Sequence, residues 1–282
     1  MKYFVVLRPW QWFKNVLIFV PIILSGEGNL VNVFISFILF SFLASGNYII
    51  NDIKDIDLDK FHPKKQNRPI ANGSIDITTA KLISIFLIVL PVIFIHQLIN
   101  SLSLIFLLYF ILVSIYTFYL KQIAFLNTLL LATFFQIRLV IGGISSGVEI
   151  SNLLFLYIFL VSFLLGVLKK KSILFNQRVN LNEYKQLIVS ENKIIPINII
   201  IYITIFLVNL VMFLWLFENQ FFQTKEMPYL VLFILLHITY TFSLSKAATN
   251  SELEDFVIGI IQNKLLFFHT ILLIFNFTFL YF

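Results

Sequence analysis

Long apolar runs separated by short polar segments dominate the hydropathy pattern of this chain. The stretches 78–120 and 196–217 consist almost entirely of Ile, Leu, Phe and Val. A helix of about 20 such residues crosses the hydrocarbon core of a bilayer, because it satisfies all of its backbone hydrogen bonds internally. We therefore predict an all-α, polytopic membrane protein with about nine transmembrane helices, at 14–26, 31–50, 78–98, 101–120, 123–143, 150–168, 196–217, 227–245 and 264–281.

The polar segments 51–77, 169–195 and 246–263 all emerge on one side of this nine-span arrangement. With a cytoplasmic N-terminus, all but two of the 20 Lys and Arg residues fall on the cytoplasmic side or at its edge; the exceptions are Arg138, inside a span, and Lys225. This asymmetry is what the positive-inside rule requires. We predict a multi-pass protein of the cytoplasmic (inner) membrane whose functional site lies at the cytoplasmic face.

Composition supports this class and excludes others. Hydrophobic residues make up 60% of the 282 residues and charged residues 12%, whereas soluble domains carry about 25% charged residues. The net charge of +6 is explained by topology, so we expect no nucleic-acid partner. The absence of cysteine excludes disulfides and thiolate metal sites. We treat 1–282 as a single integral-membrane domain.

The first polar segment begins with a regular series of amides and carboxylates. Asn47, Asn51, Asp55 and Asp59 recur every four residues and would line one face if the second span continued as a helix, with Asp52 beside them. Stacked carboxylates repel one another unless a cation lies between them. Mg²⁺ is the candidate, since it takes oxygen ligands from one or two carboxylates together with substrate phosphate.

Cationic residues follow directly: Lys60, His62, Lys64, Lys65 and Arg68. Cations beside a metal-loaded carboxylate face suit a polyanionic ligand, and arginine binds phosphate in bidentate fashion. The alternative is a solvated loop with ordinary surface charge. Because the acidic residues begin on a membrane helix and share its face, we favour the metal and phosphate interpretation.

At these residues the chain resembles the UbiA superfamily of intramembrane prenyltransferases, whose first signature is N-D-x-x-D-x-x-x-D. Asn51, Asp52, Asp55 and Asp59 match it, and Arg68-Pro69-Ile70 follows. The resemblance implies a bundle of nine helices with the site at its cytoplasmic end.

A narrower resemblance is to the decaprenyl-phosphate phosphoribosyltransferase branch of that superfamily. It is carried by Arg8-Pro9-x-Gln11-Trp12-x-Lys14-Asn15, His62-Pro63-x-Lys65, Tyr116-x-x-Tyr119-Leu120-Lys121 and Arg138-x-x-x-Gly142-Gly143. This branch implies Mg²⁺-dependent transfer of 5-phosphoribose from phosphoribosyl pyrophosphate to a polyprenyl phosphate in the membrane.

The resemblance also implies roles for individual residues. Asp52, Asp55 and Asp59, with Asn51, would hold Mg²⁺; Lys14 and Arg68 would bind donor phosphates, and Lys169 and Lys170 the lipid phosphate. The remaining residues expected to bind substrate are Asn15, Asn47, Lys65, Tyr116, Lys121 and Arg138. The branch usually has an acid after its Lys-Arg pair, where this chain has Lys-Lys and then Ile173.

Two alternatives remain open. One is a prenyltransferase that uses a prenyl diphosphate and an aromatic or other small acceptor, although the loop starting at Lys169 lacks the second Asp-rich motif of such sites. The other is a lipid transporter or lipid-binding protein. Transporters often place ionisable groups at the bilayer midplane, and Arg138 alone fits that description.

Overall fold

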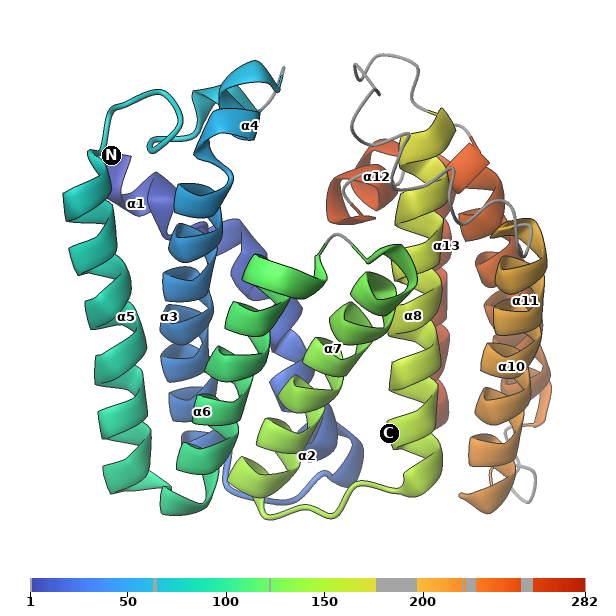
Figure 1. Cartoon of the computed structure of the whole chain (residues 1–282). Coiled ribbons are helices and arrows are strands. Elements are labelled where there is room, and N and C mark those ends of the chain that lie inside the picture. The colour runs from blue at the N-terminus through green and yellow to red at the C-terminus, as the bar shows by residue number, and fades with distance from the viewer. Residues whose placement is uncertain are drawn as a thin grey trace. The chain divides into compact units, whose positions relative to one another are not determined.

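The computed structural model describes residues 2–62, 65–121, 123–175, 197–219, 221, 227–249 and 256–281. Throughout these residues the fold is helical, without strands, which confirms the predicted all-α class (Figure 1). The chain divides into two compact units, Met1–Ile150 and Ser151–Phe282. The prediction of one domain over 1–282 stays a prediction.

Unit 1 is built around one long central helix, α3 (Leu30–Lys54). Its other elements are α1 (Lys2–Val6), the 3₁₀ segment η1 (Pro9–Phe19), α2 (Val20–Ser25), α4 (Ile56–Phe61), the 3₁₀ turn η2 (Lys65–Asn67), α5 (Ile77–Leu98), α6 (Asn100–Ile115), the π-helical turn η3 (Tyr116–Leu120) and α7 (Ala124–Ser146). Unit 2 contains α8 (Asn152–Phe175), α10 (Ile197–Glu218), α11 (Met227–Thr249), α12 (Phe256–Gln262) and α13 (Lys264–Tyr281).

Seven helices among the described residues are long and apolar enough to cross a membrane. They are α3, α5, α6 with η3, α7, α8, α10 and α11, and each corresponds to a predicted span; α13 is a shorter apolar helix. The first predicted span, 14–26, is not one α-helix, because it is divided between η1 and α2. A 3₁₀ segment rises about 2.0 Å per residue, so η1 and α2 together still extend about 30 Å. The count of nine and the cytoplasmic orientation remain predictions.

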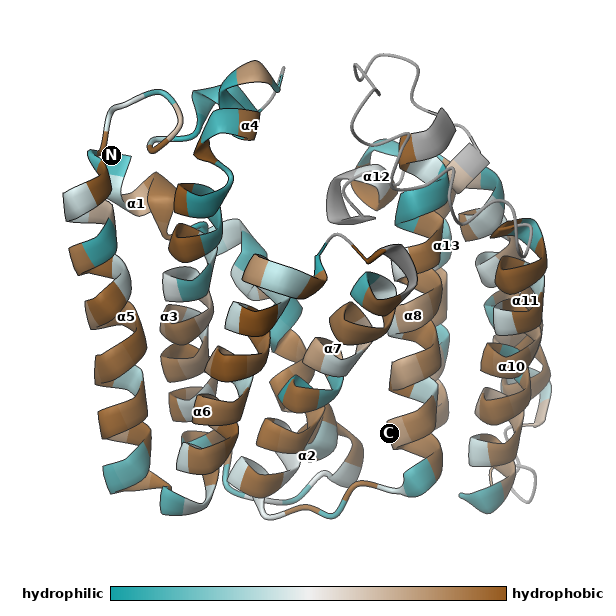
Figure 2. Cartoon of the chain, viewed as in Figure 1, coloured by the Kyte–Doolittle hydropathy of each residue, from teal (hydrophilic) through white to brown (hydrophobic). Residues whose placement is uncertain are grey.

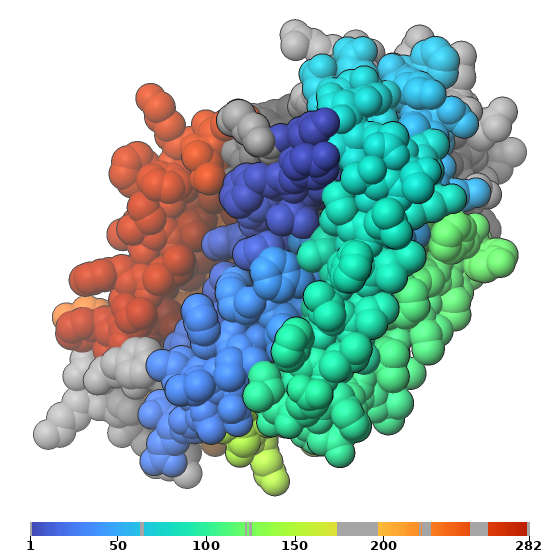
Figure 3. Space-filling model, turned by 90° about the vertical axis from the view of Figure 1, so that its left-hand side faces the viewer, coloured from blue at the N-terminus to red at the C-terminus, as the bar shows by residue number. Residues whose placement is uncertain are grey.

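Two glycines allow close helix contacts in unit 1. A methyl group on Gly142 of α7 would lie 2.2 Å from the backbone oxygen of Ile18 in η1. A methyl group on Gly46 of α3 would lie 2.8 Å from Ile88 of α5. The close packing of α5 along α3 is visible on the face shown in Figure 3. The core beneath contains Phe40, which contacts the rings of Phe106 and Tyr109.

Unit 2 has an apolar core with polar links between its helices. Leu168, Ile205 and Ala248 are buried where α8, α10 and α11 pack together. Tyr157 Oη lies 2.8 Å from Nε2 of His237, whose Nδ1 lies 2.9 Å from Oδ1 of Asn209. The outward-facing residues are also apolar, so the helices are brown over most of their length (Figure 2). Exposed apolar surface of this extent is expected where helices contact lipid.

Candidate functional site

The predicted acidic face does not form on a single continuous helix. Helix α3 ends at Lys54, Asp55 adopts φ −91° and ψ 6°, and α4 begins at Ile56. The backbone N–H groups of Asp55 and Asp59 still donate to the carbonyls four residues earlier, at 2.9 and 2.8 Å. The break at Asp55 divides the series between α3, which carries Asn47 and Asn51, and α4, which carries Asp59.

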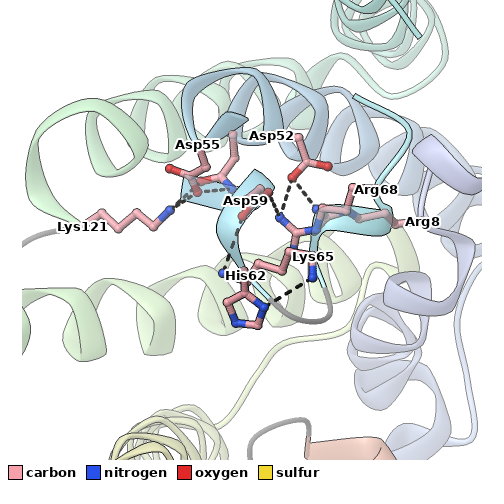
Figure 4. Close-up of polar contacts among 9 residues, drawn as sticks. Arg8, Asp52, Asp55, Asp59, His62, Lys65, Arg68 and Lys121 are labelled. Atoms are coloured by element: carbon pink, nitrogen blue, oxygen red, sulfur yellow. Dashed lines mark hydrogen bonds and ion pairs between the residues drawn. The ribbon is translucent and has the colours of Figure 1, made fainter. Parts of the chain in front are cut away.

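Asp52 and Asp59 form the buried half of the site, with 3% and 2% of their surfaces exposed. Arg68 joins them, because its Nη1 donates to Asp52 Oδ1 at 3.0 Å and to Asp59 Oδ2 at 2.5 Å. Arg8 forms a second ion pair with Asp52 Oδ1, and Lys65 Nζ lies 3.8 Å from Asp59 Oδ1. Figure 4 shows these cations around the two carboxylates. Side chains from three separate segments therefore meet at one place.

Asp55 lies beside them with a different partner. Its Oδ2 accepts a hydrogen bond from Asn51 Nδ2 at 3.1 Å and forms an ion pair with Lys121. Lys121 Nζ also donates to Asn51 Oδ1 at 3.2 Å. Lys121 follows η3, so a residue 66 positions from Asp55 completes this half. We call Arg8, Asn51, Asp52, Asp55, Asp59, Lys65, Arg68 and Lys121 the aspartate–cation cluster.

Other predicted site residues lie outside this cluster. The amide of Asn47 donates to the Leu43 carbonyl of its own helix at 3.0 Å. Tyr116 packs edge-on against Phe134, and Lys14 is exposed on η1. Lys169 and Lys170 lie near the C-terminal end of α8, in unit 2, so the expectation that a loop begins at Lys169 is wrong. Lys64 lies outside the described residues, as does most of the predicted polar segment 169–195.

Asn15 and Arg138 form a separate buried pair. Arg138 Nε donates to Asn15 Oδ1 at 2.7 Å, and Arg138 Nη1 donates to the Phe134 carbonyl at 2.6 Å. The guanidinium also lies over the rings of Phe40 and Tyr109, at 5.1 and 5.6 Å from their centroids. These contacts link η1 to α7 in the core of unit 1, and the prediction that Asn15 and Arg138 bind substrate stays a prediction.

Arg8 is a member of the cluster that we did not include among the predicted site residues. It is the one non-glycine residue with positive φ (53°) among the described residues, a conformation that is uncommon outside glycine. Trp12 Nε1 donates to Ser45 Oγ at 3.0 Å, and that hydroxyl donates to the Leu7 carbonyl at 2.7 Å. These bonds fix the N-terminal segment on α3 with Arg8 directed at Asp52. In the sequence, Arg8 is the first residue of the motif Arg8-Pro9-x-Gln11-Trp12-x-Lys14-Asn15, and this motif is the signal that could identify it as a site residue.

The charge balance of the cluster favours an anionic ligand. Four cationic side chains, of Arg8, Lys65, Arg68 and Lys121, face the three carboxylates. Burial lowers the pKa of Lys65, and the nearby Asp59 carboxylate opposes this shift. A surplus of cations over carboxylates is suited to phosphate oxygens.

The donor atoms also fit a hard divalent cation. The three carboxylates and the side-chain amide oxygen of Asn51 offer only oxygen ligands, which Mg²⁺ prefers. Within the part of the chain that the structure describes, no three His, Cys, Asp or Glu side chains converge as a metal-ligand group. The carboxylates are instead paired with the cluster's own cations. Holding Mg²⁺ there requires that some of these ion pairs open.

Comparison with known proteins gives related sequences over half of the chain. The chain is 32% identical over 154 residues to decaprenyl-phosphate phosphoribosyltransferase of Corynebacterium glutamicum, covering 52% of this chain and 46% of the relative. It is 31% identical over 154 residues to the protein of that name from Mycobacterium tuberculosis, covering 52% and 51%. These matches span about half the length of the relatives.

The fold has a neighbour over its full length. A solved UbiA homologue from Archaeoglobus fulgidus, bound to DMAPP and Mg²⁺, superposes with a TM-score of 0.69 at 16% sequence identity, covering 100% of this chain and 98% of that chain. The model of the UbiA prenyltransferase family matches residues 16–272. This match covers most of the sequence and confirms the predicted family: the chain belongs to the UbiA prenyltransferase family.

Proposed function

We propose that this protein is a Mg²⁺-dependent intramembrane transferase that moves 5-phosphoribose from phosphoribosyl pyrophosphate to a polyprenyl phosphate. The observation that carries the proposal is the aspartate–cation cluster, where four cationic side chains and three carboxylates converge from distant segments. Such a site is suited to a pyrophosphate group. The names of the Corynebacterium and Mycobacterium relatives support phosphoribose as the transferred group. We place the site at the cytoplasmic face of the inner membrane, with the N-terminus on that side.

The reaction exchanges one C–O bond for another. The bond between C1 of the ribose and the pyrophosphate oxygen breaks, and its electron pair leaves with pyrophosphate. An oxygen of the lipid phosphate forms the new bond to C1. No general base is needed, because a phosphate monoester is already anionic at neutral pH.

The cluster residues stabilise the leaving group. Arg8, Arg68 and Lys121 donate charged hydrogen bonds to pyrophosphate oxygens, where negative charge develops as the C–O bond breaks. Asn51, Asp52, Asp55 and Asp59 would hold Mg²⁺, which when bound supplies further neutralisation of pyrophosphate charge. Lys14 remains a predicted contact of the donor, and Lys169 and Lys170 predicted contacts of the lipid phosphate.

The second candidate is a prenyltransferase with a prenyl diphosphate donor. It is favoured by the family description and by the DMAPP-bound homologue of the same fold. A prenyl diphosphate would present the same pyrophosphate to the cluster, so the cluster does not distinguish the two donors. Lys169 and Lys170 lie where a second Asp-rich motif is expected, and two lysines there favour an anionic acceptor and hence the first candidate.

Mass spectrometry of the lipid product tests both candidates. Purified protein is incubated with Mg²⁺, a polyprenyl phosphate and phosphoribosyl pyrophosphate, and in parallel with a prenyl diphosphate and a small aromatic acceptor. A lipid that gains one phosphopentose supports the proposal. Prenylation of the aromatic acceptor instead would establish the second candidate. If neither donor changes the lipid or the acceptor covalently, the result favours lipid transport or lipid binding.

Asp55→Asn is the matched test of the site. Asp55 faces Asn51 and Lys121, and we expect its amide variant to lose Mg²⁺-dependent turnover by at least about a hundredfold while the protein stays folded. Asp57→Asn is the control, because Asp57 is 89% exposed and its ion pair with Lys60, at 3.6 Å, lies at the surface. Equal turnover of the two variants would contradict the assignment.

A further inference from the structure

Unit 2 contains a second polar site that the proposed reaction does not use. A cavity of about 320 Å³ opens among α8, α10 and α11, lined by Lys171, Tyr202, Phe242, Ser245 and Lys246. Ligand pockets have volumes of about 300–1,000 Å³, so this cavity is large enough for a small group. None of its lining residues belongs to the aspartate–cation cluster.

The donors in this cavity are arranged for an anion. Lys171 and Lys246 supply ammonium groups, and Ser245 and Tyr202 supply hydroxyls. Lys171 is only 4% exposed and Ser245 6%. Among the described residues, neither the Lys171 ammonium nor the Ser245 hydroxyl has a hydrogen-bond or ion-pair partner. A buried ammonium without a counter-charge is costly, and an anion in the cavity would offset that cost.

The position of the cavity points to a lipid. Lys171 and Ser245 precede the ends of α8 and α11, and Tyr202 follows the start of α10, each within about one and a half turns of the helix end. In Figure 2 the ribbon of α8 changes from brown to teal at its C-terminal end. The ends of membrane-spanning helices lie in the headgroup region of a bilayer. Basic pockets between helices bind lipid phosphates in that region.

An apolar surface adjoins the donors. Tyr202 and Phe242 are 56% and 50% exposed at the cavity. Ile203 and Phe206 extend this exposed apolar surface along α10, at 55% and 65%. A lipid chain lying along α10 would therefore place its headgroup among the two lysines.

We propose that the Lys171–Lys246 cavity binds the phosphate-monoester headgroup of a membrane lipid. Two ammonium groups and two hydroxyls match the several oxygens and the double charge of such a phosphate. The inference concerns binding within unit 2 and does not depend on the proposed transfer reaction, so the two can fail separately.

Lipid binding to the full chain tests the inference. The protein in detergent is titrated with dioctanoyl phosphatidic acid, with dioctanoyl phosphatidylcholine and with inorganic phosphate, and complexes are counted by native mass spectrometry. We expect saturable binding of one phosphatidic acid, and Lys171→Met should weaken it at least tenfold. Lys81→Met is the control, because it removes the same charge from an exposed position on α5.

Three outcomes would overturn the inference. They are equal affinities for phosphatidic acid and phosphatidylcholine, unchanged binding by Lys171→Met, and inorganic phosphate that binds as tightly as the lipid, which would make free phosphate the ligand. If Lys171→Met does not fold, acetylation of the wild-type protein tests the site instead. Phosphatidic acid, and not phosphatidylcholine, should protect Lys246 from acetylation; equal acetylation with both lipids would also reject the site.

Discussion

Arg138 and Asn15 are 123 positions apart in the chain, and their side chains meet in the buried interior of unit 1, with Nε of the guanidinium 2.7 Å from the amide oxygen. Within the described residues, no carboxylate pairs with Arg138. Its charge is held by the Asn15 and Phe134 oxygens and by the faces of aromatic rings. This pair ties η1 to α7.

We expect Asn15→Leu to destabilise unit 1 by about 1–2 kcal/mol, because the Arg138 Nε–H would lose its acceptor in a buried setting. The measurement is the thermal unfolding midpoint in detergent. Asn67→Leu, at an exposed position of η2, is the control and should leave the midpoint nearly unchanged. Equal decreases of the unfolding midpoint in the two variants would contradict a structural role for the Arg138–Asn15 pair.

Arg68→Met should destabilise the protein by about 2–3 kcal/mol, because it leaves the Asp52 and Asp59 carboxylates buried without their shared cation. Adding Asp59→Asn to Arg68→Met removes the carboxylate whose remaining cation, Lys65, lies 3.8 Å away. We therefore expect the double variant to unfold at a higher temperature than Arg68→Met alone. A double variant that is less stable than the single one would contradict this electrostatic account.

Gly142→Ala should cost about 1–3 kcal/mol, because its methyl group would meet the Ile18 backbone oxygen, which cannot move without shifting η1. Ser101→Thr is a suitable control, since it adds a methyl group at an exposed position of α6. Thermal unfolding of both variants measures the difference. Comparable stability would show that η1 and α7 can separate at little cost.

The Asp76 carboxylate caps the N-terminus of α5 by accepting a hydrogen bond from the Thr79 backbone N–H at 2.9 Å. This bond lowers the pKa of Asp76 below its usual value of 3.8. A lowered pKa means that the charged cap stabilises the fold above the unfolded-state pKa and that this contribution is lost as the pH falls through the folded-state pKa.

Asp76→Asn keeps a capping oxygen but removes the charge. We expect wild type to unfold at a higher temperature than this variant at pH 6, and the difference to shrink as the pH falls below 3.8. Unfolding midpoints of both proteins between pH 6 and pH 3 provide the check. A difference that stays constant over this range would show that the carboxylate charge does not contribute.

The membrane class, the position of most spans and the family could all be predicted from the amino-acid sequence. The class and the spans follow from local composition, because a run of about 20 apolar residues forms a helix in lipid wherever its neighbours lie. The motif Asn51-Asp52-x-x-Asp55-x-x-x-Asp59 likewise identified the acidic members of the site before any contact was known.

Which side chains meet depends instead on how the helices pack. Packing divided the acidic series at Asp55, brought Arg8 to Asp52 and Lys121 to Asp55, and placed Arg138 with Asn15 in the core. These pairings require the N-terminal segment with η1, the end of α3, η3 and α7 to come together, over separations of 44 to 123 residues. Helical periodicity relates residues three or four positions apart, so it carries no information about partners at such distances.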